Sequence, residues 1–359
     1  PSPTPSCATV RATSVPPAIP KRSREESVTP QTNITLAELA VFLRDHDDFC
    51  ICGHVSPDGD CLGSQLSLAH ALRSLGKRVV CVLARDEALD AGAASLPGAR
   101  DLVWAGLVER APQCFVAVDV PTRERLGDAA RLLDESAASA TVDHHAVDDR
   151  MTDICYTDPD SASTSLLVWE LIGYLGVEPS ADMATCAFAG LMTDTGRFQY
   201  QNADARAFSL GAEMVSRGAE PAHIGSAFYQ NRTLASVKLE AAAISHLHLI
   251  AGGSAALSYV SADDMAACGA VKADAEPLVD ILRSIAGVRV ACMLREQPDG
   301  VRGSLRAKDD TDVSALARRF GGGGHRAAAG FSVKDASVLE AVELLAEKVA
   351  DLVEGGLDG

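Results

Sequence analysis

Four short, continuously apolar segments recur in the first part of the sequence, and helical patterns lie between and after them. Strands buried on both faces of a parallel sheet give continuous apolar runs of this kind. Their alternation with helices predicts an α/β fold with a doubly wound parallel sheet. The expected strands lie around Phe49–Ile51 and at Arg78–Ala84, Cys114–Val118 and Ala140–Val142, and the expected helices include Ser165–Leu175, Ala181–Met192 and Ala205–Arg217.

A second, smaller α/β domain is predicted towards the C-terminal end. There, His246–Ile250 and Ala255–Val260 flank Gly252 and Gly253, which is a hairpin pattern. The 359 residues also fit two domains better than one. We expect a disordered tail rich in Pro, Ser and Thr over residues 1–33, a larger domain over 34–215, a helical connector over 216–246 and the smaller domain over 247–355.

Composition and charge narrow the functional classes. The formal net charge of −17 and the lack of a basic stripe disfavour long nucleic acid as a partner. No apolar stretch reaches the ~18 residues that span a bilayer, and no secretory signal is visible, so we expect no membrane partner. The ten cysteines form no CxxC pair and lie among apolar residues. They favour reduced core thiols in a cytoplasmic protein and give no support to a zinc site.

The stretch Ile51–Ser64, ICGHVSPDGDCLGS, predicts a strand, a loop and the start of a helix. Its loop carries His54, Asp58 and Asp60, and the intervening proline and glycine favour tight turns. In an open α/β sheet, ligands bind beyond the carboxyl ends of the strands, where this loop would lie. A solvated acidic turn is the simpler explanation of this cluster alone, so its interpretation depends on partners elsewhere in the chain.

Three further places deliver Asp or His to the same edge of the predicted sheet. Asp119 follows one apolar run, Asp143, His144 and His145 follow the next, and Asp194 lies where a helix enters a loop. A capping or core role would explain any one of them, but not all of them together. Convergent Asp and His favour divalent cations such as Mn²⁺ or Mg²⁺. The number of side chains favours two ions roughly 3.5–4 Å apart, bridged by Asp119, which would activate a shared water for in-line hydrolysis of a phosphate ester.

These motifs together resemble the DHH phosphoesterases with a DHH-associated C-terminal domain, in particular the bacterial nanoRNase and pAp-phosphatase branch. The resemblance extends over residues 35–355, nearly everything except the tail. The motifs that carry it are His54-x3-Asp58-x-Asp60, Asp119, Asp143-His144-His145, Asp194 and the run Gly321–Gly324 followed by His325.

The resemblance implies a role for each of these positions. His145 would face the substrate phosphate and protonate the leaving oxygen, and Asp143 would accept a ring N–H and so orient a histidine. Mn²⁺ would be the cofactor, two ions per site, with Mg²⁺ or Co²⁺ as substitutes. The ligands of one ion would be His54, Asp58 and Asp119, and those of the other would be Asp60, Asp119, His144 and Asp194.

In the C-terminal domain, consecutive glycines would let backbone N–H groups approach a phosphate, and Arg306 offers a planar fork to its oxygens. A flexible linker is the alternative explanation of the glycine run. Asp148 stands where the family usually carries Asn, so substrate details that depend on that position stay open. The substrate-binding residues implied by the resemblance are Ser304, Arg306, Gly322, Gly323, Gly324 and His325.

We therefore predict a Mn²⁺-dependent phosphoesterase that releases mononucleotides from short linear RNA such as pApA, in a cleft between the two domains. Further expected substrates are 3′-phosphoadenosine 5′-phosphate and cyclic di-AMP, and the sequence leaves the preferred substrate among the three open. The resemblance also implies a homodimer. One alternative is an inorganic pyrophosphatase, which would need several lysines near the C-terminal site. Another is a non-catalytic nucleotide sensor, which the intact metal-ligand motifs disfavour.

Overall fold

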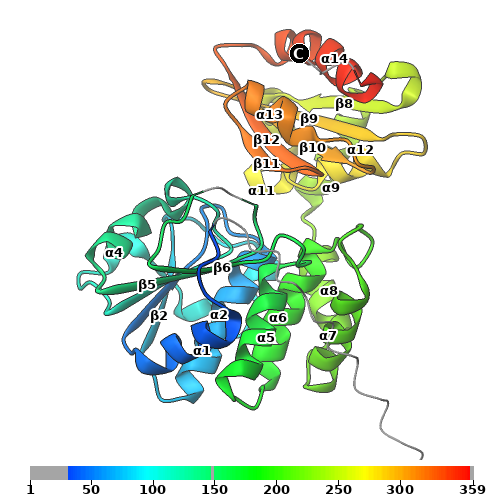
Figure 1. Cartoon of the computed structure of the whole chain (residues 1–359). Helices are drawn as coiled ribbons and strands as arrows, with labels where there is room; N and C mark the ends of the chain where they lie inside the picture. The colour runs from blue at the N-terminus through cyan, green and yellow to red at the C-terminus, as the bar shows by residue number, and fades with distance from the viewer. Residues whose placement is uncertain (1–30, 147–148, 356–359) are drawn as a thin grey trace, which may run out of the picture.

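Two six-stranded sheets organise the chain, one in each half (Figure 1). The computed structural model describes residues 31–146 and 149–355, and every structural statement below concerns these residues. The first sheet is parallel throughout, and the second is mixed. The predicted α/β fold, with a parallel sheet in the N-terminal part and a second α/β part after it, is confirmed. Asp148 and residues 1–30 of the predicted tail lie outside the described residues.

The parallel sheet has the strand order β3-β2-β1-β4-β5-β6. The order reverses between β1 and β4, so the connections that leave these two strands run to opposite faces and open a crevice at their carboxyl ends. The two strands pair from Phe49 opposite Cys114 to Cys52 opposite Ala117. The strands are β1 (Phe49–Cys52), β2 (Val79–Leu83), β3 (Val103–Trp104), β4 (Cys114–Val118), β5 (Ala138–Asp143) and β6 (Ile154–Thr157).

Helices cover both faces of this sheet (Figure 1). Successive residues of a strand point to opposite faces. Ile51 accordingly belongs to the core under the first group of helices, and Cys52 belongs to the core under the second. The first group is α1 (Leu36–Asp45), α2 (Gly59–Ser74), α5 (Thr164–Leu175) and α6 (Ala181–Asp194), and the second is the 3-10 helix η3 (Arg123–Ala129) and α4 (Ala130–Glu135).

Helix caps fix where the chain enters the crevice. The Asp58 carboxylate caps α2 by accepting from the backbone N–H groups of Asp60 and Cys61 at 3.1 and 3.0 Å. The Ser163 hydroxyl caps α5 in the same way. Thr35, the cap expected for the first helix, forms a reciprocal capping box with Glu38.

Two glycines allow α2 and α6 to approach closely. A Cβ atom at Gly63 would lie 2.5 Å from the Cys186 carbonyl oxygen, closer than real Cβ atoms are found, and 3.0 Å from the Gly190 nitrogen. A side chain at either glycine would therefore separate the helices. The close approach brings the C-terminal end of α6, with Asp194, next to the N-terminal end of α2, with Asp60.

The segment expected to be a helical connector contains two helices that belong to different cores. Ile224 of α8 is buried in the core of the parallel sheet, whereas Leu239 and Ala243 of α9 are buried against the second sheet. The chain passes from one core to the other at residues 230–233. The helices of this region are α7 (Ala205–Ser216), α8 (Pro221–Tyr229) and α9 (Leu234–Ser245), and the short α3 (Ala91–Ala94) precedes them and packs on α8.

The second sheet has the order β11-β12-β10-β9-β8-β7, with β8 and β9 parallel and the other pairs antiparallel. One face packs on α13 and α14, and the other on α9 and α12. The predicted hairpin is present as β7 and β8. The elements are β7 (His248–Ile250), β8 (Ala255–Val260), α10 (Ala262–Cys268), α11 (Lys272–Ala275), α12 (Leu278–Ser284), β9 (Val290–Gln297), β10 (Gly300–Ala307), α13 (Val313–Arg319), β11 (Gly323–His325), β12 (Ala328–Lys334) and α14 (Val338–Glu354).

Thr32 and Asn33, at the end of the predicted tail, form hydrogen bonds with the parallel sheet. The Thr32 hydroxyl donates to the Thr157 carbonyl at 2.9 Å, and the Asn33 N–H donates to the Cys155 carbonyl at 3.0 Å. These bonds run along β6, the edge strand of the parallel sheet, and satisfy backbone groups that would otherwise lie open.

The cysteines in the described part of the chain are free thiols, and all of them except Cys268 are buried. Within residues 31–146 and 149–355, no helix combines the length and the apolar character needed to cross a membrane.

Candidate active site

Every acid and imidazole predicted from the N-terminal half lies at one end of the parallel sheet. His54 follows β1, Asp119 follows β4, and Asp143 ends β5, directly before His144 and His145. Asp58 and Asp60 lie at the start of α2, and Asp194 ends α6. The structure thus brings residues from four separate stretches of sequence into the crevice between β1 and β4.

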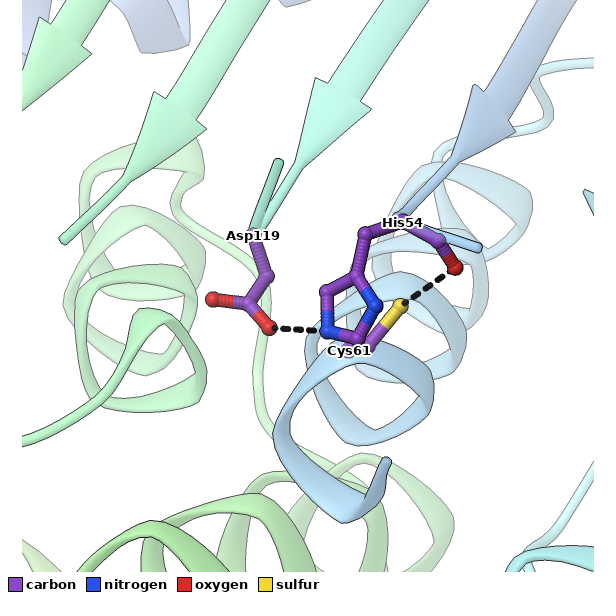
Figure 2. A group of neighbouring side chains, drawn as sticks. All are labelled: His54, Cys61 and Asp119. Atoms are coloured by element: carbon purple, nitrogen blue, oxygen red, sulfur yellow. Dashed lines mark hydrogen bonds and ion pairs between the residues drawn. The ribbon is translucent and has the colours of Figure 1, made fainter. Parts of the chain in front are cut away.

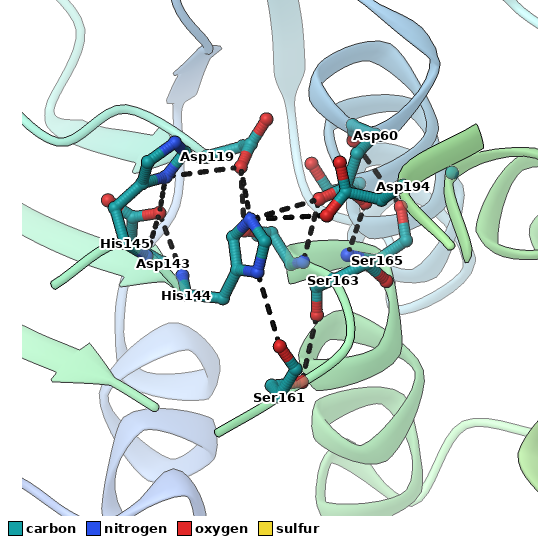
Figure 3. Close-up of polar contacts among 12 residues, drawn as sticks. Asp60, Asp119, Asp143, His144, His145, Ser161, Ser163, Ser165 and Asp194 are labelled. Carbon is teal, nitrogen blue, oxygen red and sulfur yellow. Dashed lines mark hydrogen bonds and ion pairs between the residues drawn. The ribbon is translucent and has the colours of Figure 1, made fainter. Parts of the chain in front are cut away.

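One group of side chains converges on the His144 ring (Figure 3). Its Nε2 atom lies 3.4 Å from Asp194 Oδ2, 3.6 Å from Asp119 Oδ1 and 4.0 Å from Asp60 Oδ2. These separations exceed those of hydrogen bonds. They match the distances between ligand atoms that share one ion, because ligands held at about 2.1 Å lie roughly 3 to 4.2 Å apart in an octahedron.

A second group surrounds His54 (Figure 2). Its Nε2 atom lies 3.5 Å from Asp119 Oδ2 and 3.9 Å from Asp58 Oδ1. The Cys61 thiol completes a set of potential ligand atoms with His54 and Asp119, all within 4.8 Å of one another. Cys61 was not predicted from the sequence as a site residue, although its position directly after Asp60 in the loop motif could have indicated it.

Asp119 stands between the two groups. Its Oδ2 atom faces His54, and its Oδ1 atom faces His144 and His145. Its backbone has φ = 54°, a left-handed conformation that is uncommon for a residue other than glycine and is often found at functional sites. With one oxygen directed at each group, the Asp119 carboxylate is oriented as a bridging ligand would have to be.

The N-terminal end of α5 donates hydrogen bonds to two carboxylates of the cluster, those of Asp60 and Asp119. Backbone N–H groups of Thr164 and Ser165 donate to the two oxygens of Asp60 at 2.7 and 2.8 Å, where the helix dipole also favours negative charge. The Thr164 hydroxyl donates to Asp119 Oδ1 at 2.9 Å. Neither Thr164 nor Ser165 was predicted from the sequence as a site residue. The run of Ser and Thr before an apolar helix, which is typical of an N-cap, could have indicated them.

The histidine rings are oriented by backbone carbonyls. His144 Nδ1 lies 3.3 Å from the Ser161 carbonyl oxygen and His54 Nδ1 lies 2.9 Å from the Val55 carbonyl oxygen. A protonated Nδ1 that donates to these carbonyls leaves Nε2 with a lone pair directed at the carboxylates, as a metal-binding imidazole requires.

His145 and Asp143 form a pair beside this group. The Asp143 carboxylate accepts from the backbone N–H groups of His144 and His145 at 2.7 and 3.1 Å, and its Oδ1 atom lies 2.8 Å from His145 Nδ1. Asp143 thus orients the His145 ring. His145 Nδ1 also lies 3.6 Å from Asp119, so the roles predicted for these two residues stay predictions.

The electrostatics of the cluster reflect an excess of negative charge in a buried place. Burial, together with the nearby Asp119 carboxylate, raises the pKa of Asp60 to about 7, and burial and the facing carboxylates raise the pKa of Asp194. Burial would also raise the pKa of Asp119, but the imidazoles around it lower that pKa overall. Burial disfavours charge on His144, yet the carboxylates raise its pKa. A divalent cation would neutralise the same charge directly, so the donor set fits such an ion.

Removing the Thr164 hydroxyl should weaken metal binding without unfolding the protein. Thr164→Val keeps the shape but leaves Asp119 Oδ1 without its donor, and partners of this kind contribute about 10–100-fold to metal affinity. Titration calorimetry with Mn²⁺ measures the change. Thr141→Val is the control, because it removes an equally buried hydroxyl, on β5, which bonds the Thr152 hydroxyl and no carboxylate of the cluster. Equal Mn²⁺ affinities in the two variants would contradict the supporting role of Thr164.

The predicted residues of the C-terminal part lie on and beside β10. Ser304 and Arg306 share one face of that strand, and Arg306 Nε lies 3.9 Å from Asp280 Oδ1. The glycine run ends α13 and continues into β11, which pairs with β12, so the flexible-linker alternative is wrong. At Gly322 a Cβ atom would lie 2.1 Å from the Gly330 carbonyl oxygen, and Gly324 has φ = 142°. Packing therefore accounts for two of these glycines.

Comparisons with known proteins agree with this architecture. The model of the DHH family, N-terminal domain, matches residues 48–191, and that of the DHHA1 domain matches residues 258–355. The bifunctional oligoribonuclease and PAP phosphatase NrnA of Thermus thermophilus is 29% identical over 84% of this chain and 89% of its own length. The cyclic-di-AMP phosphodiesterase GdpP of Geobacillus thermodenitrificans is 28% identical over 89% of this chain and 49% of its own.

A solved structure, that of an exopolyphosphatase-related protein from Bacteroides fragilis, superposes with a TM-score of 0.82 at 26% identity and covers 89% of this chain and 97% of the other. The fold and the site together define an α/β phosphoesterase with a cluster suited to divalent metal. The chain carries a DHH family domain in its N-terminal part and a DHHA1 domain in its C-terminal part.

Proposed function

We propose that this protein is a Mn²⁺-dependent phosphoesterase that hydrolyses short linear oligoribonucleotides such as pApA to mononucleotides and also acts on 3′-phosphoadenosine 5′-phosphate. The observation that carries the proposal is the convergence of Asp60, Asp119, His144 and Asp194 on one side of the crevice and of His54 and Asp119 on the other. The similarity to NrnA over most of both chains supports the choice of substrate.

The acids and imidazoles of the N-terminal part would act as ligands of two metal ions. His54, Asp58 and Asp119 would hold one ion, and Asp60, Asp119, His144 and Asp194 the other. When bound, the ions would supply charge stabilisation and polarisation at the phosphate. Asp58 Oδ1 both caps α2 and lies 3.9 Å from His54 Nε2, so the carboxylate is held at the position where a ligand of the first ion would lie.

His145 would act as the general acid that protonates the leaving group. Asp143 Oδ1 lies 2.8 Å from His145 Nδ1 and orients the ring, and His145 Nε2 would carry the proton that is transferred to the oxygen of the departing nucleotide. The buried Asp143 carboxylate stabilises the protonated imidazole, as a general acid of this kind requires.

We propose that the substrate lies in a cleft between the two domains, with its distal phosphate held by Ser304, Arg306 and the segment from Gly322 to His325. A net charge of −17 disfavours long polyanions, and a cleft of this kind accommodates a molecule of a few nucleotides. The same chemistry extends to cyclic di-AMP, which the similarity to GdpP favours as a second candidate substrate.

Arg306→Ala should weaken substrate binding and leave metal content unchanged. A charge-assisted hydrogen bond to phosphate is worth about 1.5–3 kcal/mol, so we expect a rise in KM for pApA of roughly tenfold to a hundredfold. Metal analysis and steady-state kinetics measure the two effects. Arg318→Ala, which removes an arginine paired with Asp312 on α13, is the control. Loss of bound Mn²⁺ in the Arg306 variant would contradict the assignment.

A substrate panel tests the proposed function as a whole. The full chain with Mn²⁺ is assayed against pApA, a longer oligoribonucleotide, 3′-phosphoadenosine 5′-phosphate, cyclic di-AMP and inorganic pyrophosphate, with kcat/KM compared. We expect pApA to be the best substrate and pyrophosphate to be cleaved poorly. Preference for pyrophosphate or for the long strand would overturn the proposal.

A further inference from the structure

An arginine of the C-terminal part lies over an aromatic ring of the N-terminal part. Arg283, on α12, has its Cζ atom 4.2 Å from the centroid of the Tyr200 ring. That distance is well inside the range of about 6 Å in which a guanidinium is attracted to an aromatic face. Only 16% of the Arg283 side chain is exposed, so the contact is largely shielded from water.

Tyr200 is rigidly connected to Asp194. The Tyr200 N–H donates to the Thr195 carbonyl at 3.0 Å, and its ring lies against Gly196, where a Cβ atom would be 2.1 Å from a ring carbon. The Asn202 side chain donates to the Asp194 carbonyl at 3.1 Å. The Tyr200 ring therefore belongs to a segment that is hydrogen-bonded to the end of α6, where Asp194 lies.

The segment between these residues has a special backbone conformation. Gly196, Arg197 and Phe198 all have positive φ, which is unusual for three consecutive residues and costly for the two that are not glycine. The Phe198 ring packs against Phe188 and Phe208, with centroids 5.8 and 5.1 Å away. Aromatic packing thus holds the turn that presents Tyr200 to the C-terminal part.

On its other side, Arg283 is connected to Arg306. An Arg283 terminal nitrogen lies 3.2 Å from Asp280 Oδ1, and the same oxygen lies 3.9 Å from Arg306 Nε. A continuous series of contacts therefore runs from Asp194 through Tyr200, Arg283 and Asp280 to Arg306.

A second contact between the two parts supports this placement. Lys272 Nζ, on α11, lies 3.5 Å from the hydroxyl of Ser56, which is in the loop between His54 and Asp58. The contact is long and exposed, so it contributes little binding energy. It shows, however, that α11 faces the loop between His54 and Asp58, whereas α12 faces the segment that follows Asp194.

We propose that Arg283 is a positioning residue. Through its contact with Tyr200, it keeps the sheet that contains Arg306 at a fixed distance from the crevice in which Asp194 lies. A substrate gripped at both places can bind only when the two parts keep a fixed separation, and the Tyr200–Arg283 contact sets that separation. The proposal rests on the proposed function for the role of Arg306, but the contact itself is independent of any substrate.

Hydrogen exchange tests the contact without substrate. We compare the full Mn²⁺-loaded chain with Arg283→Ala, Arg283→Lys and the control Arg318→Ala, whose arginine pairs with Asp312, the N-cap of its own helix α13. Arg283→Ala should raise exchange in both 196–201 and 278–285, two segments far apart in sequence. Arg283→Lys should restore part of the protection, because it keeps a cation near the ring. Unchanged exchange in 196–201 for Arg283→Ala would overturn the proposal, whatever the substrate.

Kinetics on pApA tests the positioning role. Arg283→Ala should raise KM by roughly tenfold, with kcat within about twofold and bound Mn²⁺ unchanged. A purely structural defect would instead lower kcat through loss of active protein and leave KM as it was, which would overturn the proposal. Tyr200→Leu, which removes the ring from the opposite side, should raise KM similarly, and the double variant should be no worse than either single one. Failure of wild-type protein to cleave pApA would overturn the proposed function and leave the exchange result standing.

Discussion

Asp119→Ala should abolish hydrolysis and lower the number of bound divalent ions. The side chain faces His54 with one oxygen and His144 with the other, so its loss removes a ligand from both groups at once. Metal ions contribute several kcal/mol of transition-state stabilisation, and each 1.36 kcal/mol is a factor of ten. We therefore expect kcat/KM to fall by about a thousandfold or more, measured by steady-state assay together with metal analysis.

Asp153→Ala is the matched control for this variant. Asp153 accepts from the Ser139 backbone and hydroxyl near the start of β5, at the opposite end of the sheet from the crevice. The Asp153→Ala substitution removes one carboxylate from the same sheet and should leave metal content and activity close to normal. Near-normal turnover of the Asp119 variant in Mn²⁺ would rule out the bridging role.

Gly190→Ala should disrupt both stability and the site, although it adds a single methyl group. The new Cβ atom would lie 1.9 Å from the Ser165 hydroxyl and 2.8 Å from Asp60 Oδ1, in the contact between α6, α2 and α5. Overpacking of this kind costs about 1–3 kcal/mol. Relief of the clash requires Asp60 to move. We therefore expect both the Mn²⁺ affinity and the free energy of unfolding to decrease. Chemical denaturation and titration calorimetry measure the two.

Gly173→Ala provides the comparison. Gly173 is also inside a helix, α5, but a Cβ atom there would meet no heavy atom of the described residues within 4 Å. Because alanine is the better helix former, this variant should be stabilised by about 0.5–1 kcal/mol and bind Mn²⁺ normally. Equal effects of the two substitutions would show that helix propensity, and not the close approach of α2 and α6, controls the result.

The central elements of the fold were predictable because their patterns are local. The strand at Cys114–Val118 and the helices near 165–175 and 181–192 are apolar and well bounded, and the structure contains them. The two edge strands of the parallel sheet were not predicted. β3 has only two residues, and β6 alternates between buried and half-buried positions instead of being continuously apolar. The helix α8 was missed as a separate element, since its contacts with the first core are tertiary and leave no periodic signal.

The acids and imidazoles of the site were predictable because strands of a parallel sheet end at a common edge. Asp119 and Asp143 could be placed there from their position directly after apolar runs. The supporting residues were not predictable in this way. Thr164 and Cys61 reach the site only because α5 and α2 begin at the crevice, and that depends on how the helices pack.

The contact between Tyr200 and Arg283 is a third kind of feature. Neither residue belongs to a motif, and 83 positions of sequence separate two surfaces that the fold brings together. Sequence patterns report which residues of one element share a face, but they carry no information on how two domains are placed relative to each other.

Anomalous scattering from a crystal of the Mn²⁺-loaded protein would test the central claim most directly. We predict two manganese peaks, one bounded by Asp60, His144 and Asp194 and the other by His54 and Asp58, with Asp119 between them. Peaks elsewhere in the molecule, or none in the crevice between β1 and β4, would contradict the assignment of these residues as metal ligands.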